Sequence, residues 1–205
     1  MKLQAGERYF QELNEQIRQC KDTCIEIENC LGQRYIGAGL SDKNIVIHGT
    51  PGNALGAYLN GGSITVYGNV QDATGDTLNQ GEIIIHGNAG DAAGYAMRGG
   101  KILIQGDAGY RAGIHMKAYE QKIPAIVIGG CAGSFLGEYQ AGGNIVVLGR
   151  NCPEDKAPVG YFCATGMHGG KIFLRSRVLP DLPEQVVSHV ATLEDMQEIL
   201  PLIDD

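Results

Sequence analysis

The sequence predicts an all-β fold: a single-stranded, right-handed parallel β-helix of about seven coils, with a short helix at each end. Three observations lead to this prediction: a 19-residue repeat, an aliphatic strand at the start of each repeat, and 31 glycines among 205 residues. That glycine content is about twice the usual share. Because it comes without excess proline and without a three-residue period, it excludes collagen and indicates many tight turns.

The first glycine after each aliphatic strand marks the repeat. From Gly49 the spacing is 19 residues three times, then 24 across an expansion within residues 116–124, then 19 again. A unit of this length has no room for the helical crossover of a βαβ unit, so the units should stack as a solenoid. The glycines expected at the corners are Gly49, Gly56, Gly68, Gly75, Gly87, Gly94, Gly106, Gly113, Gly130, Gly137 and Gly149.

Alternation within the strands predicts two inward-facing aliphatic ladders. One starts at Ile45 and the other at Ile47, and each continues at the equivalent position of every later repeat. The outward position between them is also mostly apolar, unlike a solvated face. We therefore expect this column to be covered by the flanking helices or to be a subunit interface. It consists of Val46, Thr65, Ile84, Leu103, Val127, Val146 and Phe173.

The repeats divide the chain into three parts. Residues 1–26 are predicted to be an N-terminal helical segment, because Phe10, Leu13 and Ile17 fall at helical spacing. Residues 27–178 hold the repeats, and residues 179–205 form a C-terminal helical tail. In that tail Thr192 and Asp195 have the spacing of a capping box.

Composition limits the kind of partner and the compartment. A net charge of −7 argues against nucleic acid and anionic membrane surfaces. No run of about 18 apolar residues is present, so we expect no membrane span. The first residues lack the apolar core of a signal peptide, and six cysteines are too sparse for a disulfide scaffold. A cytoplasmic location is expected.

The glycine-rich loops do not indicate a ligand site. A dinucleotide fingerprint needs one such loop opening a helix, whereas here the loops recur, lack a following helix and lack the lysine of a P-loop. Calcium-binding β-rolls place aspartate after their paired glycines, whereas here aliphatic residues follow.

The remaining polar candidates also favour structural roles. His48, Tyr67, His86 and Gln105 form one column, in which histidines two coils apart are too far from each other to share a metal without other ligands. A solvated or interface ladder is expected instead. The cysteines lack the paired spacing of zinc or iron–sulfur motifs. We predict no catalytic, cofactor-binding or metal-binding residue in this chain.

The repeated units resemble a known domain. The stretches "GNAGDAAGYAMRGGKILIQGDAGYRAGIHM" and "LGQRYIGAGL" are similar to the GXGXG repeat domain that ends the large (alpha) subunit of glutamate synthase. A relative of that domain forms one of the subunits of formylmethanofuran dehydrogenase. The resemblance covers about residues 27–178 and implies a stand-alone, archaeal-type form of the domain with a structural role.

The resemblance implies a non-catalytic scaffold subunit in glutamate biosynthesis. Its partners would be a glutaminase and an FMN-dependent synthase subunit, with the FMN and the iron–sulfur cluster on the partners. Two alternatives stay open: the corresponding subunit of a molybdenum or tungsten formylmethanofuran dehydrogenase-like enzyme, and an independent solenoid binding module. In the last case the isolated chain would form a homo-oligomer.

Overall fold

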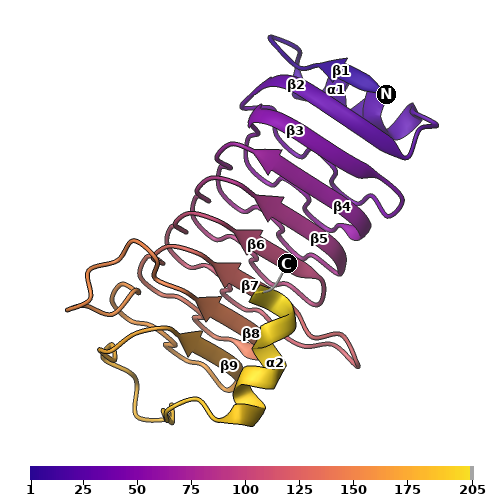
Figure 1. Ribbon diagram of the computed structural model, residues 1–205. Helices are drawn as coiled ribbons and strands as arrows, with labels where there is room; N and C mark the ends of the chain where they lie inside the picture. Colours follow the sequence, from indigo (N-terminus) through magenta and orange to yellow (C-terminus); the bar gives the residue numbers. More distant parts are fainter. Residues whose placement is uncertain (204–205) are drawn as a thin grey trace.

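The computed structural model describes residues 1–203 and contains one sheet, whose strands are joined by long connecting segments (Figure 1). Helix α1 (Phe10–Gln19) lies near the start of the chain and helix α2 (Leu193–Ile203) lies near its end. The strands are β1 (Lys2–Gln4), β2 (Cys24–Leu31), β3 (Asn44–Thr50), β4 (Asn60–Tyr67), β5 (Gln80–Ile85), β6 (Lys101–Ile104), β7 (Ala125–Ile128), β8 (Ala141–Val147) and β9 (Gly169–Leu174).

The nine strands are parallel and lie in the order of the sequence, from β1 to β9. Register follows the repeat, so that Ile45 of β3 pairs with Ile64 of β4, and Ile64 pairs with Ile83 of β5. Because equivalent residues are neighbours, the inward aliphatic side chains form continuous ladders. These ladders and the apolar residues of the connecting segments, such as Leu55 and Leu78, form one buried core.

The predicted β-helix is wrong as the fold class. The strands form one open parallel sheet, and the segments that connect them within residues 1–203 form no second or third sheet. Isolated bridges such as Val70 with Ala89, and single backbone hydrogen bonds such as that from the Gly75 N–H to the Leu55 carbonyl, join these segments. The physical reason is the backbone of these segments. In the connection after β3, Ala54, Gly56 and Tyr58 all have φ between +57° and +63°. Residues in this left-handed region turn the chain and cannot continue an extended strand.

The strand count also differs from the predicted seven coils. β1 and the start of β2 lie within residues 1–26, for which the sequence predicted helix alone. Leu3 of β1 pairs with Ile27 of β2 and is buried, which adds another strand to the sheet. Three residues are too few to show the alternation that identifies a strand in sequence.

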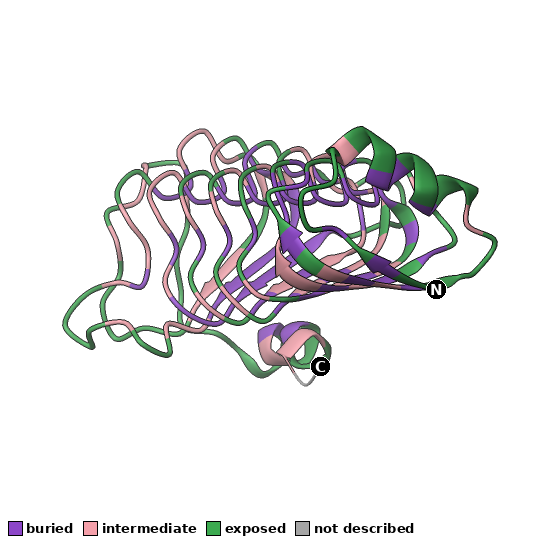
Figure 2. Cartoon of the chain, turned by 90° about the horizontal axis from the view of Figure 1, so that it is seen from above, coloured by how far each residue is buried: buried purple, intermediate pink, exposed green. Residues whose placement is uncertain are grey.

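The two helices lie on opposite sides of the sheet (Figure 2). α1 lies at the N-terminal end, where Leu13 and Ile17 are buried in the main core. α2 lies against the outer face of the sheet, where Ile199 forms a second, smaller core with Val127 and Val146. Neither helix is long and apolar enough to cross a membrane.

Candidate functional site

The outward column predicted from the sequence is divided by α2 into a covered and an open part. Over β6 to β9, the four outward side chains pack against α2 and contact Met196, Ile199, Leu202 and Ile203; these four are Leu103, Val127, Val146 and Phe173. Val127 and Val146 become buried there. Over β3 to β5, Val46, Thr65 and Ile84 are half-buried and belong to neither the main core nor the smaller core under α2.

Polar contacts fix α2 on the covered part. Lys171 Nζ of β9 lies 2.6 Å from Glu198 Oε2, and Asn144 Nδ2 of β8 donates to Glu198 Oε1 at 3.0 Å. The helix begins with the capping box that the sequence indicated, in which the Asp195 N–H donates to Thr192 Oγ1 and the Thr192 N–H donates to Asp195 Oδ2. These two hydrogen bonds satisfy donors that a helix start leaves free.

Stacked rings border the open part of the column. The His48 and Tyr67 rings are nearly parallel with centroids 5.2 Å apart, and the Tyr67 and His86 centroids lie 4.6 Å apart. His86 Nδ1 lies 3.3 Å from Gln105 Oε1, so the predicted ladder is continuous. Tyr67 is 52% exposed, which leaves the ring edges accessible to solvent.

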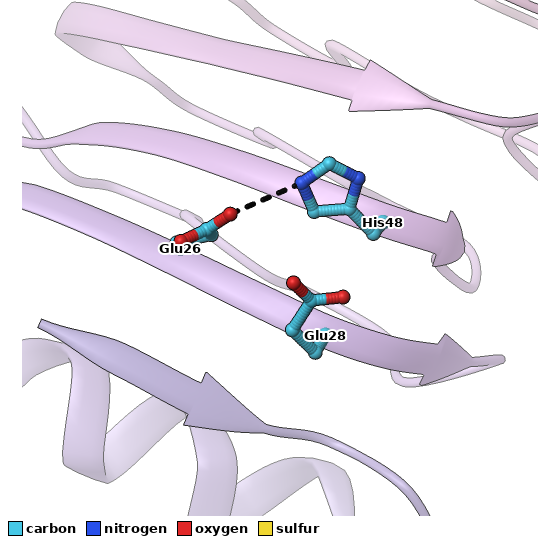
Figure 3. Close-up of side chains that lie close together, drawn as sticks. All are labelled: Glu26, Glu28 and His48. Carbon is cyan, nitrogen blue, oxygen red and sulfur yellow. Dashed lines mark ion pairs between the residues drawn. The ribbon is translucent and has the colours of Figure 1, made fainter.

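A polar cluster lies on the same face, at the N-terminal end (Figure 3). Glu26 and Glu28 point outward from β2, and His48 points outward from β3; their ligand atoms lie within 4.8 Å of one another. Two carboxylates and an imidazole suit a transition metal by chemistry. The sequence alone did not indicate this cluster, because the register between β2 and β3 brings it together.

The lysine of β1 supplies the positive charge in this cluster. Lys2 Nζ lies 2.8 Å from Glu28 Oε1 and 3.5 Å from Glu26 Oε2, while His48 Nε2 lies 3.3 Å from Glu26 Oε1. The hydrogen bond from Lys2 lowers the pKa of Glu28, and the same bond raises the pKa of Lys2. A metal ion would have to displace this ammonium group, so the geometry favours an ion-pair network.

The polar residues at the corners bind backbone atoms of the next repeat. Asn69 Oδ1 accepts the N–H of Asn88, and Asn88 Oδ1 accepts the N–H of Asp107, both at 2.8 Å. Asp72 Oδ1 likewise accepts the N–H of Asp91 at 2.9 Å. These side chains therefore link successive repeats.

The corner glycines are required by both conformation and space. Gly56 has φ +63°, and a Cβ added there would lie 2.6 Å from Ile83 Cδ1. Gly68 would meet the backbone oxygen of Gly49. A side chain at either position would therefore collide with the neighbouring repeat.

The structure joins two cysteines to which the sequence assigned no role. Cys131 and Cys152 form a disulfide with a Cα–Cα distance of 6.0 Å, which ties the insertion around residues 151–158 to the repeat before it. Their separation of 21 residues did not indicate a disulfide in the sequence, because only the stacking of the repeats brings the two cysteines side by side. Cys20, Cys24, Cys30 and Cys163 are free.

The C-terminal end of the sheet holds a cavity of about 440 Å³. It extends around β9 and is lined by residues of both faces of this strand, by the preceding repeat, by the tail between β9 and α2, and by α2 itself. Its walls are mainly apolar and include Met167, Leu174, Leu182 and Val186. Sequence reasoning missed this site because nothing in the repeat pattern indicates how the last strand is covered.

Comparison with known proteins gives two matches. The family model of the GXGXG motif matches residues 7–203. A protein of Methanocaldococcus jannaschii that is itself uncharacterized is 42% identical over 216 residues, which span 99% of this chain and 82% of that protein. The similarity thus extends beyond the repeats to both helices.

Proposed function

Because this chain belongs to the GXGXG family, we propose that it is a non-catalytic scaffold subunit of a glutamate synthase-type oxidoreductase. The chain would hold a glutaminase subunit and an FMN-dependent synthase subunit in register, so that ammonia passes between them. The flavin and the iron–sulfur cluster would reside on the synthase. The observation that carries the proposal is the family match over nearly the whole chain, since this motif occurs in the large subunit of glutamate synthase.

The surface of the sheet supports a docking role. The half-buried Val46, Thr65 and Ile84 continue the apolar column beyond the reach of α2. Tyr67 adds an aromatic ring with 52% exposure at its border. Aromatic side chains surrounded by polar groups are enriched at protein–protein interfaces.

Affinity purification of the tagged chain from its native cells tests the proposal. We expect a glutaminase and a flavin-containing subunit to co-purify, with the absorbance spectrum of bound flavin in the eluate. Removing this chain should lower glutamine-dependent glutamate formation by the remaining subunits. If no complex forms and glutamate formation is unchanged, the proposal is wrong.

Two variants locate the docking face. Ile84→Lys places a charge in the open part of the column and should abolish co-purification. Tyr58→Lys is the matched control, because Tyr58 is 58% exposed and lies in a connecting segment outside the sheet.

Molybdenum or tungsten in place of flavin in the eluate would instead identify the formylmethanofuran dehydrogenase-like alternative. A homo-oligomer without partners would identify the independent module.

A further inference from the structure

We propose that the free edge of β9 binds an extended peptide segment of a partner chain, which adds to the sheet as a tenth parallel strand. The segment would carry aliphatic residues at two alternating positions, followed by an acidic residue beside Arg175. This inference rests on the proposed scaffold role, because that role supplies the partner chain. It identifies where and by what chemistry the partner is held.

The edge of β9 is available for backbone pairing. β9 is last in the sheet order and pairs only with β8. The Arg175 N–H donates to the Val147 carbonyl of β8, so by the alternation of a parallel strand the N–H and C=O groups of Ile172 and Leu174 point to the free side. Between residues 176 and 203, no backbone group of the chain hydrogen-bonds to them. Unpaired strand edges are templates for a further strand.

The cavity provides space along this edge. Its walls include Ile172 and Leu174 from the inner face of β9 and Phe173 and Arg175 from the outer face, so it follows the strand rather than one side of it. Leu182 and Val186 of the tail form the opposite wall. A volume of about 440 Å³ lies within the usual range of ligand-binding pockets.

The repeat indicates the apolar part of the ligand. The inward ladders pass through Ile145 and Val147 of β8 to Ile172 and Leu174 of β9 and then stop. Both β9 residues are only half-buried, whereas their β8 partners are fully buried. A further strand with aliphatic side chains at the same two positions would bury this apolar surface and gain the corresponding transfer free energy.

Charge indicates one flanking residue of the ligand. Lys171 of β9 is already paired with Glu198 and Asp195, whereas Arg175, which directly follows β9, is exposed. Arg175 has no ion-pair partner within residues 1–203; its Nη1 donates only to the Leu148 carbonyl at 3.1 Å. Elsewhere in the sheet, opposite charges meet across adjacent strands, as Glu82 and Lys101 do at 3.0 Å. A glutamate beside Arg175 would repeat that arrangement.

Fluorescence anisotropy with the full chain and a labelled synthetic peptide, GGSIVIEG, tests the inference. We expect saturable binding, together with slower hydrogen exchange at the amides of Ile172 and Leu174. N-methylation of the central valine should weaken binding about tenfold, because its N–H would face β9. N-methylation of the first isoleucine is the matched control, since that N–H would face away from β9.

A charge reversal tests the flanking contact without altering the core. Arg175→Glu should weaken binding of this peptide about threefold and strengthen binding of GGSIVIKG by a similar factor. Arg177→Glu is the control, because Arg177 lies beyond the strand and its side chain is 83% exposed. Both residues are exposed, so the fold should be retained.

The outcomes separate this inference from the proposed function. No saturable binding, or equal loss with both methylated peptides, overturns the inference. If native partners still co-purify in that case, the scaffold role stands and the β9 edge is simply covered by the chain's own tail. Peptide binding without native partners would sustain the edge site and contradict the scaffold role.

Discussion

At each end of the sheet the terminal repeat lacks a neighbour on one side, and the two ends are covered to different extents. At the N-terminal end, α1 buries Leu13 completely and leaves Ile17 only 1% exposed against the core. At the C-terminal end, the tail leaves a cavity, and Leu179 and Val187 are 65% and 88% exposed. Repeat proteins need capping elements because the terminal repeats lack one neighbour. The comparison shows that only the N-terminal end is closed by packing.

Hydrogen bonds reinforce the same difference. At the N-terminal end, Asn14 Nδ2 donates to the Arg34 carbonyl at 2.8 Å, and the buried Lys43 Nζ donates to the Cys20 carbonyl at 2.9 Å. At the C-terminal end, the hydrogen bonds found within residues 176–192 join residues of the tail, such as Ser176 and Val178, or reach α2. The C-terminal end is therefore the part expected to open first.

The largest expected effect is a loss of stability at the closed end. Leu13→Ala should lower the free energy of unfolding by about 2–5 kcal/mol, because it leaves a cavity in a fully buried site. Leu182→Ala in the half-buried tail should lower it by about 1 kcal/mol or less. Urea denaturation followed by circular dichroism measures both. Equal losses would mean that the two ends are capped alike.

Thiol reactivity compares the ends without removing any contact. Burial raises the pKa of Cys30, near the N-terminal end, and of Cys163, on the cavity wall, to about 11 in each case. At pH 8 about one thiol in a thousand is then ionised at either site. Because burial raises the pKa of both thiols, the pH dependence of each alkylation rate separates the contribution of ionisation from that of opening.

We expect Cys163 to react with iodoacetamide several-fold faster than Cys30, and the exposed Cys24 to react fastest. Mass spectrometry of the digested protein after timed alkylation measures the three rates. Raising the pH toward 11 should accelerate both buried sites in parallel. A Cys163 that reacts as slowly as Cys30 would show that the cavity stays closed.

The capping box of α2 is expected to have a smaller and pH-dependent effect. The backbone N–H of Thr192, its hydroxyl group and then His189 lower the pKa of Asp195 well below its usual range. A lowered folded-state pKa stabilises the docked helix above the ordinary carboxyl pKa of about 3.9, and this contribution is lost as the pH falls through the lowered value.

Thr192→Ala keeps the backbone N–H that Asp195 accepts but removes the hydroxyl donor, so it should raise the pKa of Asp195 part of the way toward its ordinary value and loosen α2. Carbon-13 NMR titration of the Asp195 carboxyl carbon measures the shift directly. Thr165→Ala is a suitable control, because Thr165 lies in a connecting segment and its hydroxyl donates to the Phe162 carbonyl. An unchanged Asp195 titration in Thr192→Ala would contradict the capping role.

The smallest effect is expected at the ion-pair network on β1 and β2. Lys2→Gln removes the charge that faces Glu26 and Glu28, but the Lys2 side chain is 57% exposed. Exposed pairs of this kind contribute little, so the urea midpoint should not move measurably. Addition of zinc or manganese to the wild type should leave thermal stability unchanged. Stabilisation by zinc that is stronger in Lys2→Gln would instead reveal a metal site.

The sequence determined the repeat, the inward ladders and the outward column, because side chains that recur at a fixed period must occupy equivalent positions in every repeat. Ile45, Ile64 and Ile83 pair as expected. The family also followed from these repeats. The fold class did not: the connections form no further sheet, because left-handed residues such as Ala54 and Tyr58 turn them.

Only the tertiary structure decided what happens where the repeat ends. Three features depend on contacts between positions that do not follow the repeat. They are the pairing of β1, the cluster of Lys2 with Glu26 and Glu28, and the Cys131–Cys152 disulfide. The same holds for α2, which covers Val127 and Val146 but leaves Val46 open although all three belong to one column. A periodic sequence predicts the environment that equivalent residues have in common. At the ends of the sheet these residues have different neighbours, so the repeat no longer predicts their environment.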